Sequence, residues 1–403
     1  MAPSQPTTTT TSPSHLSPSE LAYLHTSLSL PPSSHGPIRP DGRSPTQFRP
    51  LTAETDILPG ANGSARVGFA DGSEVVVGVK AEICKVDVRQ EDVRGVGVGG
   101  DGDEEGGDEG EGEGDGGGGK ATGSGWVQMS IEIPGYRDDD ALPVFLAEMM
   151  REAVLAGGEG LMRRLRVNRR WGWRVYVDIL LLSPPLSYPL PLLSLATHLA
   201  LLSTRLPRLK SEGEEDPLFD DDWDVAEYLY PRSSSHSKNI NNKQWFRPPI
   251  TLLVISVGEN IIFDPSREEI AVAEAVLAVS VGRSEDEDGS AASGDNPLKL
   301  LSIRTVDPPS RMTHPGIPDS ENAATTSVGL DSGAGAGGVV GAGGAGREDT
   351  GAALGGGDEV PGVWRPRRGG VKRSVISRMV KLVLEKGGVG DEVLEGLEGV
   401  RVG

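Results

Sequence analysis

The sequence has almost no cysteine and few aromatic residues. Cys84 is the only cysteine among 403 residues, which excludes an intramolecular disulfide and a metal site built from several thiolates. Aromatic residues make up only 4% of the chain, whereas glycine and proline are abundant, with 56 and 30 residues. A chain this poor in large apolar side chains is predicted to have a core smaller than its length suggests, interrupted by insertions.

Long apolar stretches are also missing. The longest, 175–182, is too short to span a bilayer, so we expect no membrane association. The first 15 residues are rich in Thr, Ser and Pro and lack the apolar segment of a secretory signal. The expectation is a soluble intracellular protein.

The net charge of −20 is unusual for a partner of RNA, because phosphate contacts need Lys and Arg. The charge is concentrated, however. Segment 101–115 contains nine acids and no base, and segment 212–224 contains eight acids and no base. Without these two segments the chain is close to neutral, so the net charge describes the insertions and not the folded surface.

Motifs for nucleotide, metal or hydrolase chemistry are absent or incomplete. Residues 114–120 approach a phosphate-binding loop, but Ala121 stands where the magnesium-binding hydroxyl is needed, and no strand precedes. The six histidines are scattered, and no serine-nucleophile elbow occurs. We therefore expect no metal site and no cofactor.

Hydrophobic patterning separates ordered segments from insertions. A disordered tail is expected at 1–16, an acidic Gly-rich insertion at 92–125, a polar insertion at 210–244 and a Gly/Ala/Ser-rich linker at 307–362. The remaining segments are expected to fold: 17–91 and 126–209 form the N-terminal part of one domain, and 245–306 and 363–388 form its C-terminal part.

The periodicity of the ordered segments predicts an alternation of helices and strands. Helices are expected at 18–29, 139–155, 192–206 and 371–386, and strands at 64–83 (a hairpin), 126–133, 173–181, 250–264 (a second hairpin) and 298–306. Within 267–282 periodicity does not separate a short helix from a strand. Asp71 and Gly72 predict a two-residue type I′ turn in the first hairpin. Leu180 and Leu182, on the second face of strand 173–181, predict burial on both faces. Segment 157–170 is taken as a basic connection, and the residues after 388 are expected to fray.

Several phrases recur in a fixed order. Segment 37–83 contains RPDGR (39–43), GSARV (63–67) and VGVKAE (77–82); VYVDILLL (175–182), IFDPS (262–266) and KRSV (372–375) follow. This order resembles that of the RNase PH-like ring subunits of the RNA exosome, in particular the lineage called ribosomal RNA-processing protein 42.

The resemblance implies an α+β chain with the RNase PH-like fold (ribosomal protein S5 domain 2-like), made of two βαβ-like halves with long disordered insertions. It also implies a ring built with other RNase PH-like subunits and capped by S1/KH subunits. Single-stranded RNA would pass through this ring to a separate nuclease for 3′→5′ processing and degradation. The implied locations are the nucleus, the nucleolus and the cytoplasm.

The phosphorolytic site of active relatives is degenerate here. Such relatives are expected to carry a Gly-rich loop before the buried helix, but Pro184 and Pro185 occupy that loop and remove amide donors. Asp264 matches the first of two aspartates about six residues apart, and Ile270 replaces the second. These departures predict an inert subunit. The alternatives are a phosphate-dependent 3′→5′ exoribonuclease, active alone or across a subunit interface, and a scaffold without an RNA role.

Basic residues in the shared phrases, or close to them, are the candidates for an RNA path or a subunit interface. They are Arg43, Arg66, Lys80 and Arg137, together with Arg163 and Arg164 from the densest basic cluster. Backbone contacts from such residues would suit single-stranded RNA. Each is equally consistent with a solvated side chain or an ion pair within the chain.

Overall fold

The computed structural model describes residues 16–31, 33, 36–85, 125–157, 159–211, 213, 215–230, 246–283, 298–307 and 371–401. The tail predicted at 1–16, the acidic insertion at 92–125 and the linker at 307–362 lie outside the described residues, apart from one terminal residue each.

The first sheet has five strands in the order β1-β2-β3-β5-β4. They are β1 (Leu51–Thr55), β2 (Gly63–Phe69), β3 (Glu74–Lys85), β4 (Val127–Glu132) and β5 (Trp171–Leu181). Neighbouring strands are antiparallel except β4 and β5, which are parallel. The connection between those two contains α2 (Ala141–Ala156) and α3 (Glu159–Leu165), so this half contains the βαβ unit that parallel pairing requires.

The second sheet has four antiparallel strands in the order β11-β10-β8-β9. They are β8 (Ile250–Val257), β9 (Asn260–Phe263), β10 (Ala275–Arg283) and β11 (Leu298–Asp307). The short helix α5 (Arg267–Ala271) connects β9 to β10. A two-stranded ribbon of β6 (Arg205–Leu206) and β7 (Glu227–Tyr228) lies outside both sheets, and η3 (Trp223–Val225) precedes β7.

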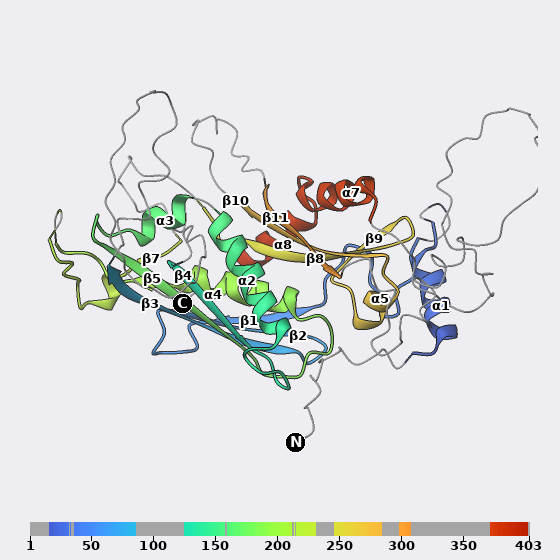
Figure 1. Cartoon of the computed structure of the whole chain (residues 1–403), viewed down its shortest axis with the longest axis horizontal. Coiled ribbons are helices and arrows are strands. Elements are labelled where there is room, and N and C mark those ends of the chain that lie inside the picture. The colour runs from blue at the N-terminus through green and yellow to red at the C-terminus, as the bar shows by residue number, and fades with distance from the viewer. Residues whose placement is uncertain are drawn as a thin grey trace, which may run out of the picture.

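Helix α4 (Leu190–Ser203) lies between the two sheets, beside α2, and contacts β2, β3 and β8 (Figure 1). All of its residues are buried, because sheet residues cover it from both sides. Helix α7 (Arg373–Leu384) contacts β10 and β11 of the second sheet, α8 (Val389–Glu398) packs against α7, and α1 (Pro18–Leu28) contacts α5. Two sheets packed around buried helices confirm the predicted α+β fold class.

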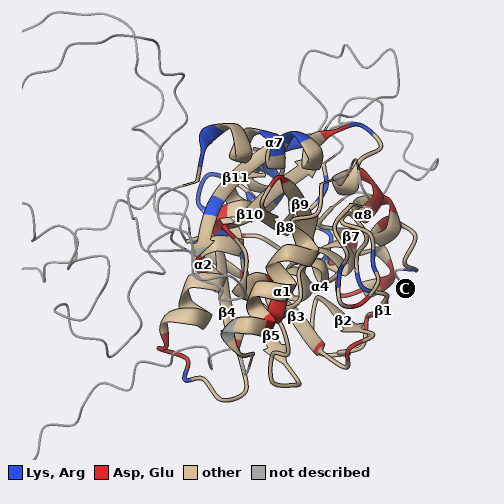
Figure 2. Ribbon diagram, turned by 90° about the vertical axis from the view of Figure 1, so that its right-hand side faces the viewer, with Lys and Arg blue, Asp and Glu red and all other residues tan. Residues whose placement is uncertain are grey.

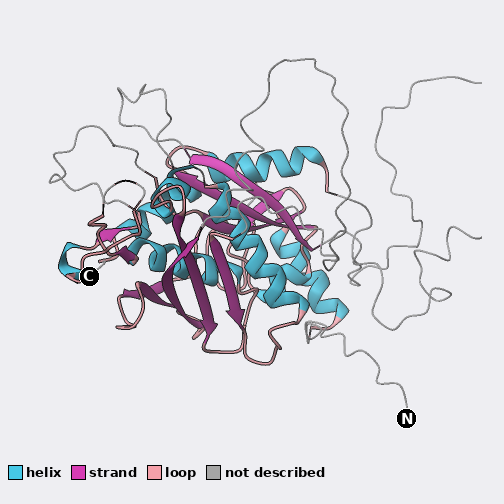
Figure 3. Cartoon of the chain, turned by 60° about the vertical axis from the view of Figure 1, so that its left-hand side comes forward, coloured by secondary structure: helices cyan, strands magenta, loops and turns pink. Residues whose placement is uncertain are grey.

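The first sheet has helices on only one face (Figure 3). Strand β5 is central, as predicted, but its inward residues Val175, Val177 and Ile179 are buried while Leu180 is 43% exposed and nearby Leu182 is 46% exposed. The prediction of burial on both faces was wrong. A run of leucines cannot show which side of a strand lacks a covering layer.

The turn of the first hairpin also differs from its prediction. Gly72 has φ +87°, but Asp71 does not have the positive φ that a type I′ turn requires. The amide of Gly72 donates to the carbonyl of Phe69, and the amide of Phe69 donates to the carbonyl of Ser73. The loop therefore has three residues, a type I turn followed by a left-handed glycine.

Several elements were not predicted from the sequence, and three of them are part of the main fold. Strand β1 pairs with β2, and α3 occupies part of the predicted basic connection, with Leu161 and Leu165 buried. Helix α8 follows residue 388, where fraying was predicted, and buries Leu394 and Leu397. It is fixed to the second sheet by the ion pairs Arg283–Asp391 and Arg247–Glu398, which no local pattern could reveal.

Part of the predicted polar insertion packs on the domain. Leu229 and Tyr230 are buried, and the rings of Tyr230 and Phe246 lie 4.9 Å apart. Phe219 lies 4.9 Å from Trp173 of β5, measured between ring centroids. The segment up to residue 230 therefore contributes core contacts despite its acidic composition.

Within the part of the chain that the structure describes, no helix combines the length and the apolar character needed to cross a membrane.

The close approach of β2 to the end of α4 makes Gly63 sensitive to substitution. A Cβ atom at Gly63 would lie 2.5 Å from the Cα of Thr204, whereas a Cβ at Gly60 would meet nothing within 4 Å. We predict that Gly63→Ala lowers the free energy of unfolding by about 1–3 kcal/mol through overpacking. Gly60→Ala should leave it nearly unchanged. Urea unfolding followed by tryptophan fluorescence measures both, and equal midpoints for the two variants would contradict the packing described here.

Candidate functional site

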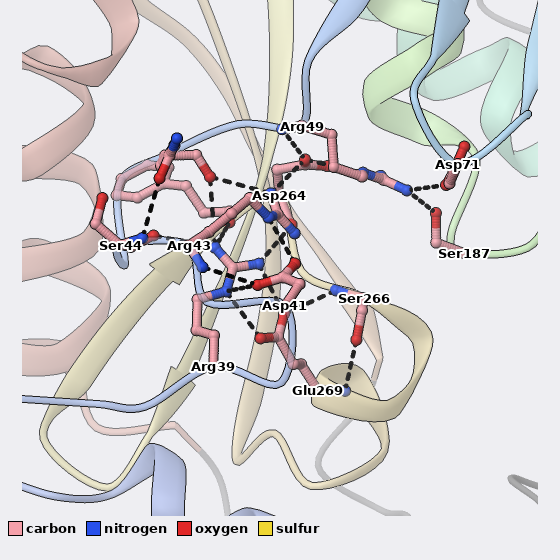
Figure 4. Close-up of polar contacts among 12 residues, drawn as sticks. Arg39, Asp41, Arg43, Ser44, Arg49, Asp71, Ser187, Asp264, Ser266 and Glu269 are labelled. Carbon is pink, nitrogen blue, oxygen red and sulfur yellow. Dashed lines mark hydrogen bonds and ion pairs between the residues drawn. The ribbon is translucent and has the colours of Figure 1, made fainter.

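Residues 37–50 form a segment that crosses the end of β9 and helix α5, and we call it the arginine strap. It carries Arg39, Arg43 and Arg49, whose side chains converge on Asp264 and Glu269 (Figure 4). Asp264 directly follows β9, and Glu269 lies in α5. The site therefore joins an early segment of the chain to the second sheet.

The innermost contact is the ion pair between Arg39 and Glu269, whose side chains are both fully buried. Nε and Nη2 of Arg39 donate to the two carboxylate oxygens of Glu269 at 2.8 and 2.9 Å, a bidentate geometry. Arg39 also donates to the carbonyls of Phe263 and Asp264. One carboxylate oxygen of Glu269 additionally accepts from the amide of Ser266, which completes the capping box of α5.

Asp264 is fully buried and has φ +44°, in the left-handed region that only Gly, Asn and Asp visit readily. Its carboxylate accepts four hydrogen bonds. Arg49 provides three of them, from its amide at 2.9 Å, Nε at 3.0 Å and Nη2 at 2.7 Å, and Arg43 provides the fourth from Nη1 at 2.8 Å. Three of these donors reach Oδ2 and one reaches Oδ1, so the chain's own donors fully engage Oδ2 and leave Oδ1 with a single donor.

Arg49 extends the network to two other segments. Its Nη1 donates to Asp71 in the first hairpin turn at 2.6 Å and to Ser187 Oγ at 2.8 Å, and its guanidinium lies 4.4 Å from the ring centre of Phe69. Burial disfavours the charge of Arg49, but the Asp264 and Asp71 carboxylates outweigh this effect, and the pKa of Arg49 is raised. The guanidinium stays charged and holds three segments together.

The pKa of Asp71 is lowered. Burial acts to raise it, and the hydrogen bonds from Ser73 together with the charge of Arg49 act in the opposite direction and prevail. Asp71 is therefore ionised near neutral pH and available to pair with Arg49.

The two parts of the predicted degenerate site meet in space. Ser187 belongs to the loop that carries Pro184 and Pro185, and Arg49 connects it to Asp264. The N-terminus of α4 follows this loop, and Pro189 and Pro191 occupy positions where a helix would otherwise present amides. Ile270 lies in α5, partly buried against the core.

This arrangement does not suit phosphate or metal chemistry. An anion site at a helix N-terminus needs free amides, and the start of α4 is apolar, buried and rich in proline. The oxygens of Asp264 are engaged by arginine, so a magnesium ion would have to displace these donors. In the described ranges, no group of three or more His, Cys, Asp or Glu side chains could hold a metal ion.

The basic residues predicted for an RNA path do not form one cluster. Arg43 belongs to the arginine strap, where its side chain is only 9% exposed. Arg66 pairs with Glu74 at 2.7 Å, and Lys80 Nζ donates to the carbonyl of Gly60 at 3.3 Å. Arg66 and Lys80 lie on the outer face of the first sheet. Val76 of β3 pairs with Arg66, and Lys80 lies roughly 13 Å further along the same strand.

The other three candidates lie elsewhere. Arg137 is 82% exposed in the turn before α2 and contacts Asp139 at 3.1 Å. Arg163 and Arg164 lie in α3, and Arg164 donates to the carbonyl of Tyr228 at 2.5 Å and pairs with Glu227. Arg164 therefore attaches β7 to α3 within the chain.

The sequence analysis gave no role to Arg39 and Arg49, and it considered Glu269 only as a substitute catalytic acid. One signal was available, since three arginines within eleven residues of an otherwise polar connection are unusual. Their partners lie 215–230 residues away in sequence, so spacing alone could not identify them.

Two curated proteins are similar to the chain. The exosome complex component RRP42 of Saccharomyces cerevisiae is 32% identical over 271 residues, which cover 66% of this chain and 81% of that protein. The exosome complex component rrp42 of Schizosaccharomyces pombe is also 32% identical over 271 residues, covering 67% of this chain and 79% of that protein. No protein-family profile matches the chain.

Similar solved structures share less sequence. An Archaeoglobus fulgidus exosome with RNA bound to the active site has 19% identity and a TM-score of 0.43, over 71% of this chain and 86% of that one. An archaeal exosome core has 19% identity and a TM-score of 0.39, over 66% of this chain and 78% of that one. Rrp46 of rice (Oryza sativa) has 12% identity and a TM-score of 0.34, over 66% and 84%.

The Arg39–Glu269 pair allows a test of the network. We predict that Glu269→Gln lowers the free energy of unfolding by about 3–5 kcal/mol, because it leaves the buried Arg39 charge without compensation. Glu268→Gln changes an exposed neighbour in the same helix and should have little effect.

The double replacement Arg39→Met with Glu269→Leu should recover much of the loss, since a buried ion pair can be exchanged for apolar packing at little net cost. Urea unfolding of the wild-type chain and of these three variants measures the differences in the free energy of unfolding. Equal effects of Glu268→Gln and Glu269→Gln would contradict the network.

Proposed function

The chain belongs to the Rrp42 family of exosome complex components, and on this basis we propose that it is a structural and RNA-channel subunit of a eukaryotic RNA exosome ring. The observation that carries the proposal is identity of 32% over about four-fifths of each relative. In this role the chain forms part of the ring wall and supports 3′→5′ processing and degradation of RNA by an associated nuclease.

We further propose that the chain is catalytically inert. Phosphorolysis needs a pocket that binds inorganic phosphate and acids that hold magnesium or donate a proton to the leaving group. Both requirements are poorly met, because the start of α4 is blocked by proline and the carboxylate of Asp264 is engaged by Arg43 and Arg49. The arginines that could have met a phosphate neutralise an internal carboxylate instead.

The outer face of the first sheet is the proposed contact with a neighbouring ring subunit. Leu180, Leu182 and Leu186 are each at least 43% exposed on or beside this face, and exposed apolar patches of this kind commonly mark interfaces. Helix α7 is a less suitable contact, because Met379 and Val383 of its apolar stripe are buried within the chain. We therefore assign the ring contact to the sheet.

Arg66, Lys80 and Arg137 remain the proposed RNA-path or interface residues, because their side chains are accessible. Arg43 and Arg164 fit this role less well, because Arg43 is engaged with Asp264 and Arg164 is engaged with β7. Arg163 is exposed in α3 and stays a candidate. Other RNase PH-like subunits, S1/KH cap subunits and single-stranded RNA are the proposed partners, in the nucleus, the nucleolus and the cytoplasm.

The ring assignment is tested by purifying a tagged chain from its own cells and identifying the associated proteins by mass spectrometry. We expect RNase PH-like ring subunits in stoichiometric amounts, and we expect depletion of the chain to cause accumulation of 3′-extended ribosomal RNA precursors. The double variant Leu180→Asp with Leu182→Asp should lose the ring subunits. Val144→Asp, at an exposed apolar position of α2, should retain them. Recovery of the wild-type chain without ring subunits would refute the proposal.

Catalytic inertness is tested separately, with a 5′-labelled RNA tail, magnesium and inorganic phosphate. We expect no release of nucleoside diphosphates by the chain alone, because Asp264 and the start of α4 lack the required free ligands. The same assay on the reconstituted ring tests a site shared across an interface. Phosphate-dependent shortening that Asp264→Asn abolishes would favour the alternative function, a phosphorolytic exoribonuclease.

A further inference from the structure

A groove of about 520 Å³ lies between strand β11 and helix α7, on the side of the second sheet away from α4. It is lined mainly by aliphatic side chains: Ile303 from β11, and Ile376, Val380 and Leu384 from α7, with Ser377, Lys381 and Glu385 at its border. The groove is distant in the fold from the arginine strap and from the outer face of the first sheet.

Helix α7 has two apolar stripes, of which one is fully buried and the other is only partly buried within the chain. Met379 and Val383 are buried against the second sheet and hold the helix in place. Ile376, Val380 and Leu384 lie on the adjacent flank and remain partly accessible, and Ile303 is 39% exposed. The groove is therefore a preformed apolar surface on a helix that is already anchored.

Strand β11 adds a second feature, an unpaired backbone edge. Among the described strands, β11 pairs only with β10, so the amides and carbonyls of its outer edge face no other described strand over ten residues. Such an edge can add an extended peptide as a further strand, and alternate side chains of that peptide would then enter the adjoining groove.

Helix α7, which forms one side of the groove, is basic in a chain whose net charge is −20, and Lys381 and Glu385 both line the groove. Segment 371–386 contains five bases and a single acid, and Figure 2 shows the blue band that they form along α7. Lys372, Arg373 and Lys381 form no ion pair with any other described residue. Lys381 lines the groove, and Arg373 lies one helical turn before Ile376 and Ser377 on the same flank.

We propose that this groove docks an extended segment of a partner protein in which alternating aliphatic residues are flanked by acidic residues. The apolar lining accounts for the aliphatic residues, the edge of β11 for the extended conformation, and the bases of α7 for the acids. RNA fits less well, because no aromatic side chain lines the groove for base stacking. The proposal is independent of the inertness of the Asp264 site.

The first experiment selects binders from a library of randomised 12-residue peptides displayed on phage, with the full chain immobilised. Selection on the wild-type chain and on Ser374→Asp should enrich peptides with alternating aliphatic residues and acidic flanks. Selection on Val380→Asp should not enrich them. Ser374 is exposed on α7 outside the groove, so the two variants introduce the same charge on one helix. Matching thermal unfolding midpoints confirm that both variants are folded.

The second experiment measures the affinity of the most enriched peptide by fluorescence anisotropy. We expect Lys381→Glu to weaken binding at least tenfold, and a version of the peptide with lysine flanks to bind this variant better than the wild-type chain. Enrichment that is unaffected by Val380→Asp, failure to enrich any acidic aliphatic peptide, or equal affinity for both flank charges would overturn the proposal.

Two other occupants are distinguished by the same assay. If unlabelled polyuridine displaces the peptide, and Val380→Asp does not weaken this competition, the basic residues bind RNA and the peptide site is refuted. Deletion of the acidic segment 101–115 should leave the affinity of the chain for the enriched peptide within twofold of the wild-type value. A large gain on deletion would show that the chain's own acids occupy the border, and would refute a partner as its main ligand.

Discussion

The removal of two carboxylates from water is the constraint on which much of this structure depends. Asp264 and Glu269 have no exposed surface, and an isolated buried carboxylate would cost several kcal/mol in lost hydration. Arg39, Arg43 and Arg49 offset this cost, and in doing so they fix the path of segment 37–50. The first hairpin and the loop before α4 are held in the same network through Arg49, so one electrostatic requirement positions four separate parts of the chain.

The same interaction limits the chemistry that the site can perform. Asp264 keeps the place and the residue type expected of a catalytic acid, yet its oxygens accept four N–H groups, so a metal ion would have to compete with charged arginine donors. Ser187 is likewise held by Arg49. Asp264 and Ser187 thus lie where catalytic groups are expected, but their contacts with Arg49 stabilise the fold. This is consistent with a subunit whose contribution is structural.

Local patterns in the sequence predicted the elements that are stabilised locally. The Ser17–Glu20 capping box marked α1, and continuous apolar character marked α4. Strand β1 and helix α8 were missed because pairing with β2 and ion pairs to Arg247 and Arg283 stabilise them. For the site, a motif located Asp264, but its arginine partners belong to another part of the chain. The position of Asp264 in the site could be predicted from the sequence, but the arginines that surround it could not.

The long separation between the strap and its partners also bears on synthesis of the chain. Arg39 and Glu269 are 230 residues apart. At typical translation rates, the ribosome needs roughly 10–45 s to produce the intervening residues. Throughout that time Asp41 and Asp71 are the carboxylates available to Arg43 and Arg49, and Arg39 lacks Glu269. The nascent N-terminal half is therefore an incomplete unit until β9 and α5 have emerged.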